Sequence, residues 1–348
     1  MKWIFRIFAG LALIVGLVVI AGVTLDTRVR PAPETAPGYR LTSTPAPHRD
    51  RDIPVHVWYP AEPDAEPPVL LGQNALFYGH YVHIDAPAAT GPFPVVVLSH
   101  GSGGNAPQMG WLIREMVASG MIVVATNHPG TTSRDSDPFQ TIRIWERPAD
   151  LTALLDWTLG SDLPAESNRV GVLGFSLGGH SALALAGSRV TKAAFIDYCA
   201  THDGIPDCTW MLNAGVDFAT IDQPLYEADH SDPRVRAAVA VDPALSLATT
   251  PDSLAAMDLP VLVINLGQDA PAAMRADALA ATLPQGAYHV EPESWHFTFL
   301  AECSPLGRIV IGLASPDNIC SDAGLRPRAE AHAALAARIV SFLSGTLQ

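Results

Sequence analysis

Residues 169–183 read RVGVLGFSLGGHSAL, and this stretch decides the fold that the rest of the chain must fit. Its first seven residues are apolar or glycine except for Arg169, as expected of a buried strand. After residue 176 the sequence is rich in Ala and Leu, which favours a helix. At the join, GFSLGG (residues 174–179) places the hydroxyl of Ser176 among glycines. Glycine and serine are common turn residues, so the stretch by itself predicts a turn.

A sharper interpretation is a nucleophile elbow, in which a serine occupies a strained turn between a strand and a helix. Such a turn lifts Oγ of Ser176 above the sheet, and small neighbouring residues let the backbone bend tightly. The order of the other strands, and the residues that follow them, must decide between the two interpretations.

Apolar runs of strand length alternate with helical patterns over most of the chain. The predicted strands lie at residues 53–59, 93–99, 121–126, 170–173, 235–241, 259–265 and 287–291. The predicted helices lie at residues 107–119, 147–159, 177–186, 271–283 and 329–343. This alternation implies an α/β fold with a mostly parallel, doubly wound sheet.

Three segments do not follow the alternation. Residues 188–232 show little periodicity and are interpreted as a cap-like insertion before the sixth core strand, and residues 303–325 as a loop. The proline-rich residues 26–50 predict a tether. The predicted domain plan is therefore an N-terminal signal or membrane anchor with the start of the tether at 1–30, followed by one α/β domain at 31–348.

The N-terminus has the pattern of an export segment. Lys2 and Arg6 precede residues 7–25, which carry no charge and approach the length that spans a bilayer. A cleaved signal and an uncleaved anchor both fit this pattern, and a core helix fits less well because the run has no polar face. Positive residues before such a segment predict that the body of the protein lies outside, in the periplasm or the extracellular space.

The bulk composition narrows the choice of partners and compartment. The formal net charge is -14, so a nucleic-acid partner is not expected. The four cysteines are predicted to form the disulfides Cys199–Cys208 and Cys303–Cys320 in an oxidising compartment, although four cysteines allow other pairings. Zinc binding is the weaker alternative because neither pair has C-x-x-C spacing.

Three residues with complementary chemistry follow predicted parallel strands, in the chain order Ser176, Asp269, His296. The carboxyl ends of parallel strands meet at one edge of a sheet, so these side chains are expected to lie together. A neutral imidazole can take the serine proton, and a carboxylate can orient the imidazole. Asp242 also ends a predicted strand and stays open as an alternative acid, whereas Asp150 is predicted to lie on a solvated face.

An oxyanion formed at Ser176 would need two preorganised donors. The backbone N–H of Leu177 is one candidate, and the glycine-rich turn HGSGG (residues 100–104) supplies the other, for which Ser102 N–H is favoured. His100 and His128 end predicted strands and are candidates for lining the site. Three further histidines are weaker candidates for the base: His180, His289 and His332.

With these residues identified, the chain resembles the predicted dienelactone-hydrolase-like branch of the α/β-hydrolases, near bacterial lipases and the platelet-activating-factor acetylhydrolases. The resemblance is carried by VHVWYPA, VVVLSHGSGG, ATNHPG, RPADLTALLDW, GVLGFSLGGHSAL, DPRVRAAVAVDPAL, LPVLVINLGQD and HFTFLAEC. It implies the α/β-hydrolase fold, with Ser176 as nucleophile, His296 as base, and the Ser102 and Leu177 amides as oxyanion donors. It favours Asp269 as the acid, while the acetylhydrolase relatives place theirs one strand earlier, at Asp242. Dienelactone hydrolases proper use cysteine where this chain has serine, so dienelactone is not expected as the substrate.

The sequence therefore predicts an exported serine hydrolase that cleaves small-molecule or lipid-like carboxylic esters through an acyl-enzyme, without a metal or cofactor. The insertion at 188–232 is expected to cap the acyl pocket. Two alternatives remain: a serine peptidase or amidase on the same fold, and an envelope binding module that has lost catalysis.

Overall fold

The fold is described from a computed structural model, which describes residues 30–348 apart from 64–65, 203–204, 269 and 315–316, with a few single positions before residue 30. Most of the predicted export segment, and the predicted acid Asp269, thus lie outside the described residues. Within the described part of the chain, no helix is both long enough and apolar enough to cross a membrane.

A ten-stranded sheet forms the centre of the molecule, in the order β12-β11-β10-β9-β5-β6-β2-β1-β4-β3. From β12 to β6 every neighbouring pair is parallel, while β2 pairs antiparallel with both β6 and β1. The strands are β1 (Gly38–Ala46), β2 (Arg51–Tyr59), β3 (Val69–Leu71), β4 (His80–Ile84), β5 (Phe93–Ser99), β6 (Ile122–Ala125), β9 (Ala165–Phe175), β10 (Val235–Val241), β11 (Val261–Leu266) and β12 (Gly286–Glu291). All seven predicted strands are confirmed, and so is the mostly parallel sheet.

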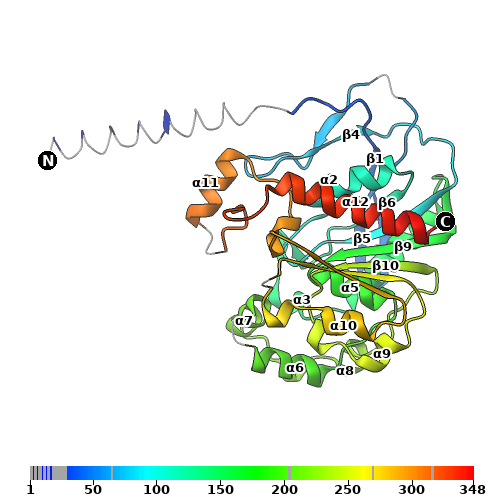
Figure 1. The fold of residues 1–348 in the computed structure, drawn as a ribbon, viewed down its shortest axis with the longest axis vertical. Coiled ribbons are helices and arrows are strands. Elements are labelled where there is room, and N and C mark those ends of the chain that lie inside the picture. Colours follow the sequence, from blue (N-terminus) through cyan, green and yellow to red (C-terminus); the bar gives the residue numbers. More distant parts are fainter. Residues whose placement is uncertain are drawn as a thin grey trace.

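Helices cover both faces of this sheet (Figure 1). Successive residues of β5 show why: Val95 and Val97 belong to one apolar core, whereas Val96 and Leu98 belong to the other. One face is covered by α4 (Glu146–Gly160), α5 (Leu177–Leu185), α9 (Pro251–Ala255) and α10 (Asp277–Thr282), and the other by α2 (Gly110–Ala118) and α12 (Arg328–Thr346). The predicted doubly wound architecture is therefore confirmed.

Short elements connect these layers. They are the two-stranded sheet β7 (Thr131–Thr132) with β8 (Asp135–Ser136), the helix α3 (Pro138–Thr141), and the 3-10 helices η1 (Pro47–Arg49), η2 (Ala106–Met109), η4 (Ser246–Ala248), η5 (Ala272–Met274) and η6 (His296–Phe299).

Three local predictions were wrong. Strand β1 lies within the predicted tether, and the predicted loop at 303–325 contains the helix α11 (Pro305–Ala314). The predicted helix at 271–283 is split into η5 and α10. The buried side chain of Asn265 explains the split, because its amide donates to Met274 O at 2.9 Å and accepts from Ala276 N at 2.9 Å.

The segment at 188–232 folds into short helices with an apolar cluster of their own. The helices are α6 (Lys192–Thr201), α7 (Pro206–Asn213), η3 (Phe218–Thr220) and α8 (Gln223–Tyr226). Phe195 and Tyr226 are buried in this cluster, which also includes Leu177 at the start of α5. We call these four helices the cap; Figure 1 shows α6, α7 and α8 grouped at one end of the molecule, away from α2 and α12.

Both predicted disulfides are confirmed. Cys199–Cys208 joins α6 to α7 within the cap, and Cys303–Cys320 closes the segment that holds α11. Disulfides persist in oxidising compartments, so the pair indicates an exported environment for this protein.

Candidate active site

Ser176 occupies a strained turn between β9 and α5. Its backbone has φ 56° and ψ -121°, a positive φ that non-glycine residues rarely adopt. The turn is fixed by hydrogen bonds: Ser176 N donates to Val241 O at 2.9 Å, and Ser176 O accepts from Ala244 N at 3.0 Å and from His180 N at 3.1 Å. This is the backbone geometry that the elbow interpretation requires.

Glycines beside Ser176 are needed because backbones approach one another closely there. A Cβ atom at Gly174 would lie 1.8 Å from the carbonyl oxygen of Gly178. A Cβ atom at Gly178 would lie 2.0 Å from the carbonyl oxygen of Ser99 in β5. The glycines of GFSLGG thus allow α5 to start directly against the end of the neighbouring strand.

His296, at the start of η6, and Asp242, directly after β10, form a hydrogen-bonded pair. His296 Nδ1 lies 3.0 Å from Asp242 Oδ2. The other oxygen, Oδ1, accepts from Asn265 Nδ2 and Leu266 N, both at 2.8 Å. Asp242 is buried with 1% exposure, so these donors compensate its charge and fix its orientation. The Nδ1–H of His296 is thereby directed to Asp242, which leaves Nε2 as the proton acceptor.

The carboxyl group in contact with His296 is that of Asp242, the alternative that the sequence left open. Asp269, which the sequence favoured, lies outside the described residues. An imidazole has one Nδ1–H to donate, and in this structure Asp242 accepts it.

Side chains from two distant helices support the turn that carries His296. Trp111 Nε1 of α2 donates to Phe299 O at 3.0 Å, and His332 Nε2 of α12 lies 2.7 Å from Thr298 O. The rings of Trp111 and His332 are stacked, with centroids 3.9 Å apart. Burial lowers the pKa of His332 to about 4, so the ring is neutral and donates through Nε2. The structure thus places His332 in support of η6.

Ser176 and His296 line one cavity of about 150 Å³, together with Ser102 and the rest of the HGSGG turn. Within that turn, Gly103 N donates to Thr131 O at 2.9 Å and Gly104 N donates to Gly101 O at 3.1 Å. The amides of Gly103 and Gly104 thus already donate within the protein, whereas Ser102 precedes them and borders the cavity.

His100 borders the same cavity but is held in a neutral form. Its Nδ1 lies 2.7 Å from Gly101 O, and its Nε2 accepts from His128 N at 3.1 Å. Burial is the main reason that the pKa of His100 lies well below its usual value. The ring therefore stabilises the turn and carries no charge.

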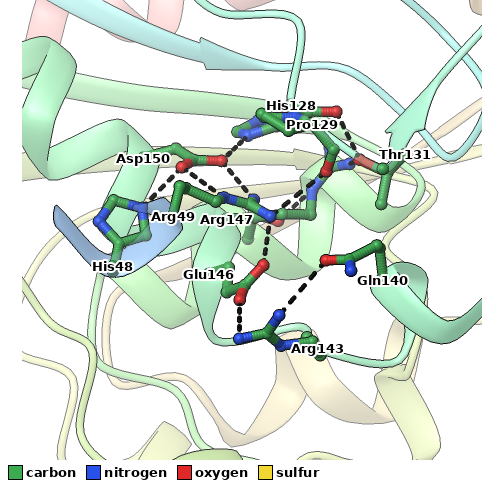
Figure 2. A network of polar contacts seen from close by, with 12 residues as sticks. His48, Arg49, His128, Pro129, Thr131, Gln140, Arg143, Glu146, Arg147 and Asp150 are labelled. Carbon is green, nitrogen blue, oxygen red and sulfur yellow. Dashed lines mark hydrogen bonds and ion pairs between the residues drawn. The ribbon is translucent and has the colours of Figure 1, made fainter. Parts of the chain in front are cut away.

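His128 lies beneath the turn, in a buried polar network (Figure 2). Its Nδ1 lies 2.8 Å from Asp150 Oδ2, and Asp150 also pairs with His48 and Arg49. Asp150 is fully buried, so the prediction that it lies on a solvated face was wrong. The sequence offered no local signal for this network, because the partners of Asp150 come from other elements.

A second, smaller cavity of about 40 Å³ lies on the cap side of Leu177. Its walls are mostly apolar and include Phe195, Tyr198 and Cys208, and Asp207 is the acidic residue among them. Burial raises the pKa of Asp207, while the charges of His296 and Arg147 lower it. A partly buried acidic side chain of the cap thus borders this space.

Comparisons with known proteins bear on this site. A sequence model of the family described as X-Pro dipeptidyl-peptidase (S15 family) matches residues 51–243, more than half of the chain. None of the curated proteins matches.

Several solved structures share the fold. The chain is similar to a ferulic acid esterase from Streptomyces cinnamoneus, with 21% identity and a TM-score of 0.62 over 91% of this chain and 92% of that one. It is also similar to a dienelactone hydrolase-like promiscuous phosphotriesterase from metagenomic libraries, with 16% identity and a TM-score of 0.53 over 90% and 99% of the two chains. The esterase Est22 gives 12% identity and a TM-score of 0.51 over 96% and 88%.

Proposed function

Because the chain belongs to the X-Pro dipeptidyl-peptidase (S15) family and has the α/β-hydrolase fold, we propose that it is a serine hydrolase that cleaves carboxylic esters. Ser176 is the nucleophile, His296 the base and Asp242 the acid. The observation that carries this proposal is the 3.0 Å contact of His296 with Asp242, at a cavity that His296 shares with a serine in a strained turn. Two of the three similar structures named above are esterases, which is the reason to propose an ester.

The reaction proceeds in two acyl-transfer steps. Nε2 of His296 takes the proton of Ser176 as Oγ bonds to the ester carbonyl carbon, and the carbonyl oxygen becomes an oxyanion. The amides of Leu177 and Ser102 donate to this oxyanion. The C–O bond to the alcohol then breaks, and the alcohol takes the proton from His296. Water repeats the sequence on the acyl-enzyme, which releases the acid and restores Ser176.

The cap determines which acyl groups reach Ser176. Its apolar residues wall the small cavity beside Leu177, and a space of about 40 Å³ suits a short acyl group better than a long chain. Turnover of p-nitrophenyl esters is therefore expected to fall as the acyl chain lengthens.

The N-terminal run at 7–25 is proposed to act as an export signal or as an anchor in the inner membrane. The basic residues before it and the disulfides of the body support this assignment. An anchored enzyme would meet lipid-like esters at the membrane surface.

A second candidate function is hydrolysis of amides or peptides, which Asp207 favours. A partly buried carboxylate in the cavity that Leu177 also lines could bind a substrate amine, and the S15 family is described by a peptidase activity. In that case aminoacyl p-nitroanilides would be cleaved faster than simple esters, and Asp207→Asn would raise KM for the aminoacyl substrates alone.

The test compares the full-length protein with Ser176→Ala on p-nitrophenyl esters of increasing acyl length and on aminoacyl p-nitroanilides. The proposal expects ester turnover that is highest for short acyl groups and is lost in Ser176→Ala. Turnover that survives in Ser176→Ala, or that is confined to the anilides, would contradict it.

A further inference from the structure

Arg147, in the first turn of α4, is a buried arginine. Each of its three nitrogens donates a hydrogen bond to a segment beside the candidate active site. Arg147 is 1% exposed. Its Nε donates to Ser181 Oγ at 3.1 Å and its Nη1 to Thr131 Oγ1 at 2.6 Å. Its Nη2 donates to Ser99 Oγ at 3.1 Å and also to His100 O. One side chain therefore ties together the end of β5, the start of β7 and the middle of α5.

Two of these contacts lie on either side of Ser102. On one side, Arg147 binds His100 O directly. On the other side, Gly103 N donates to Thr131 O at 2.9 Å, and Thr131 itself accepts from Arg147 (Figure 2). The turn that presents the Ser102 amide is thus held by Arg147 directly at one end and through Thr131 at the other.

The third contact reaches the helix that presents the other proposed donor. Ser181 Oγ accepts from Arg147 and donates to Leu177 O at 2.9 Å. Arg147 is consequently connected to both segments that carry the proposed oxyanion donors. It reaches the HGSGG turn through His100 and the start of α5 through Ser181. A planar guanidinium holds such partners in a fixed geometry, which a lysine ammonium cannot reproduce.

Arg147 differs in its hydrogen-bond partners from Arg49, another arginine of the network, whose side chain is 4% exposed. Arg49 pairs with the carboxylates Glu146 and Asp150, as Figure 2 shows. Arg147, among the described residues, has no carboxylate in ion-pair contact, and its partners are three hydroxyls and one carbonyl. Burying a charge without an ion pair costs free energy, so a contribution to stability alone is a weak explanation for this buried arginine.

The hydroxyl of Ser99 is oriented by His128, which is held in turn by the carboxylate of Asp150. Ser99 Oγ lies 2.9 Å from His128 Nε2, and His128 Nδ1 lies 2.8 Å from Asp150. Burial lowers the pKa of His128 to about 3, so the ring is neutral and Nε2 accepts from Ser99. The lone pairs of Ser99 are then free for Arg147. Ser99, His128 and Asp150 repeat the residue types of a triad, but all three are fully buried and serve as a support.

We propose that Arg147 is a positioning residue that fixes the Ser102 and Leu177 amides relative to each other, so that both donate to the oxyanion. The inference rests on the proposed serine-hydrolase function. It predicts that Arg147 stabilises the tetrahedral oxyanion state and has little effect on binding of the ester. The reason is that the Ser102 and Leu177 amides donate to the oxygen on which negative charge develops.

The test uses the full-length protein and the variants Arg147→Lys and Arg147→Met, with Arg49→Lys as a control at an arginine of the same network whose side chain is 4% exposed. Turnover of a short p-nitrophenyl ester is measured beside inhibition by a trifluoromethyl ketone, whose adduct with Ser176 carries an oxyanion. We expect kcat to fall at least about tenfold in Arg147→Lys and about a hundredfold in Arg147→Met, with KM within about threefold. Inhibitor affinity should fall by the same factor as kcat/KM, and Arg49→Lys should lose stability while keeping kcat within about threefold.

A second pair of variants removes the acceptors and leaves the charge in place, in case the Arg147 variants do not fold. Thr131→Val and Ser181→Ala should each lower kcat and inhibitor affinity about three- to tenfold. Unchanged kcat and inhibitor affinity in folded variants, or an equal loss in Arg49→Lys, would overturn the Arg147 assignment alone. Undiminished turnover in Ser176→Ala, measured in the same series, would instead overturn the proposed function on which it rests.

Discussion

At the scale of single residues, the choice between Asp242 and Asp269 shows what the sequence could and could not predict. Both acids follow predicted strands, β10 and β11, that are neighbours in the sheet, so the strand pattern by itself does not choose between them. The orientation of Asp242 is set by Asn265 and Leu266, which hold one oxygen and leave the other for His296. Those donors lie more than twenty residues away, so no local pattern reveals them.

The assignment of Asp242 predicts a large difference between two substitutions. Asp242→Asn should lower kcat about 10³- to 10⁴-fold, because an amide at this position no longer stabilises the imidazolium and favours the wrong tautomer. Asp269→Asn is the control and should change kcat less than about threefold. Steady-state ester kinetics would contradict the assignment if Asp269→Asn were the more damaging change.

At the scale of elements, the helices and strands that pack on the two cores could be predicted, because apolar periodicity reports burial. Strand β1 was missed because the prolines of residues 26–50 suggested a tether, yet it pairs along its whole length with β2, with Pro45 opposite Asp52. The helix at 271–283 was predicted as continuous because its interruption comes from Asn265, in another element. Arg147 shows the same limit: its partners come from three other segments of the chain.

Two helical glycines are expected to respond in opposite ways to substitution by alanine, because only Gly178 packs closely against a strand. Gly178→Ala should lower the free energy of unfolding by about 1–3 kcal/mol, because its Cβ would lie 2.0 Å from the Ser99 carbonyl oxygen. Gly160→Ala, at the end of α4, meets no atom within 4 Å and should be neutral or stabilising by up to about 1 kcal/mol. Urea denaturation of the two variants measures both values; equal stabilities would show that α5 can shift to accommodate the added Cβ.

At the scale of the whole molecule, buried histidines accompany a strongly acidic composition. Burial lowers the pKa of His56, His80 and His332 to about 4, from an ordinary value of 6.5. These side chains are neutral in the folded state and take up protons near pH 6.5 only after unfolding. The unfolded protein therefore binds more protons between about pH 6.5 and 4, and the free energy of unfolding should decrease as the pH falls through this range.

The net charge by itself predicts that the free energy of unfolding rises as the pH falls. A measurement of stability against pH therefore distinguishes the two effects. At pH 7 the formal net charge is -14, so acidification toward the isoelectric point near 5.2 reduces repulsion and would stabilise the fold. We expect the histidines to dominate, because each unit of pKa shift corresponds to about 1.4 kcal/mol. Urea denaturation at pH 7.5, 6 and 5 should give falling stability; a constant or rising value would contradict this account.

The central claim is that Ser176 is a nucleophile held in an elbow and activated by His296. The most direct test is to treat the protein with a fluorophosphonate and to locate the label by mass spectrometry of the digested chain. The account predicts one modified peptide with the label on Ser176, no label in Ser176→Ala, and slow labelling in His296→Ala because the base is absent. A label on another residue, or equal labelling of the wild type and Ser176→Ala, would contradict it.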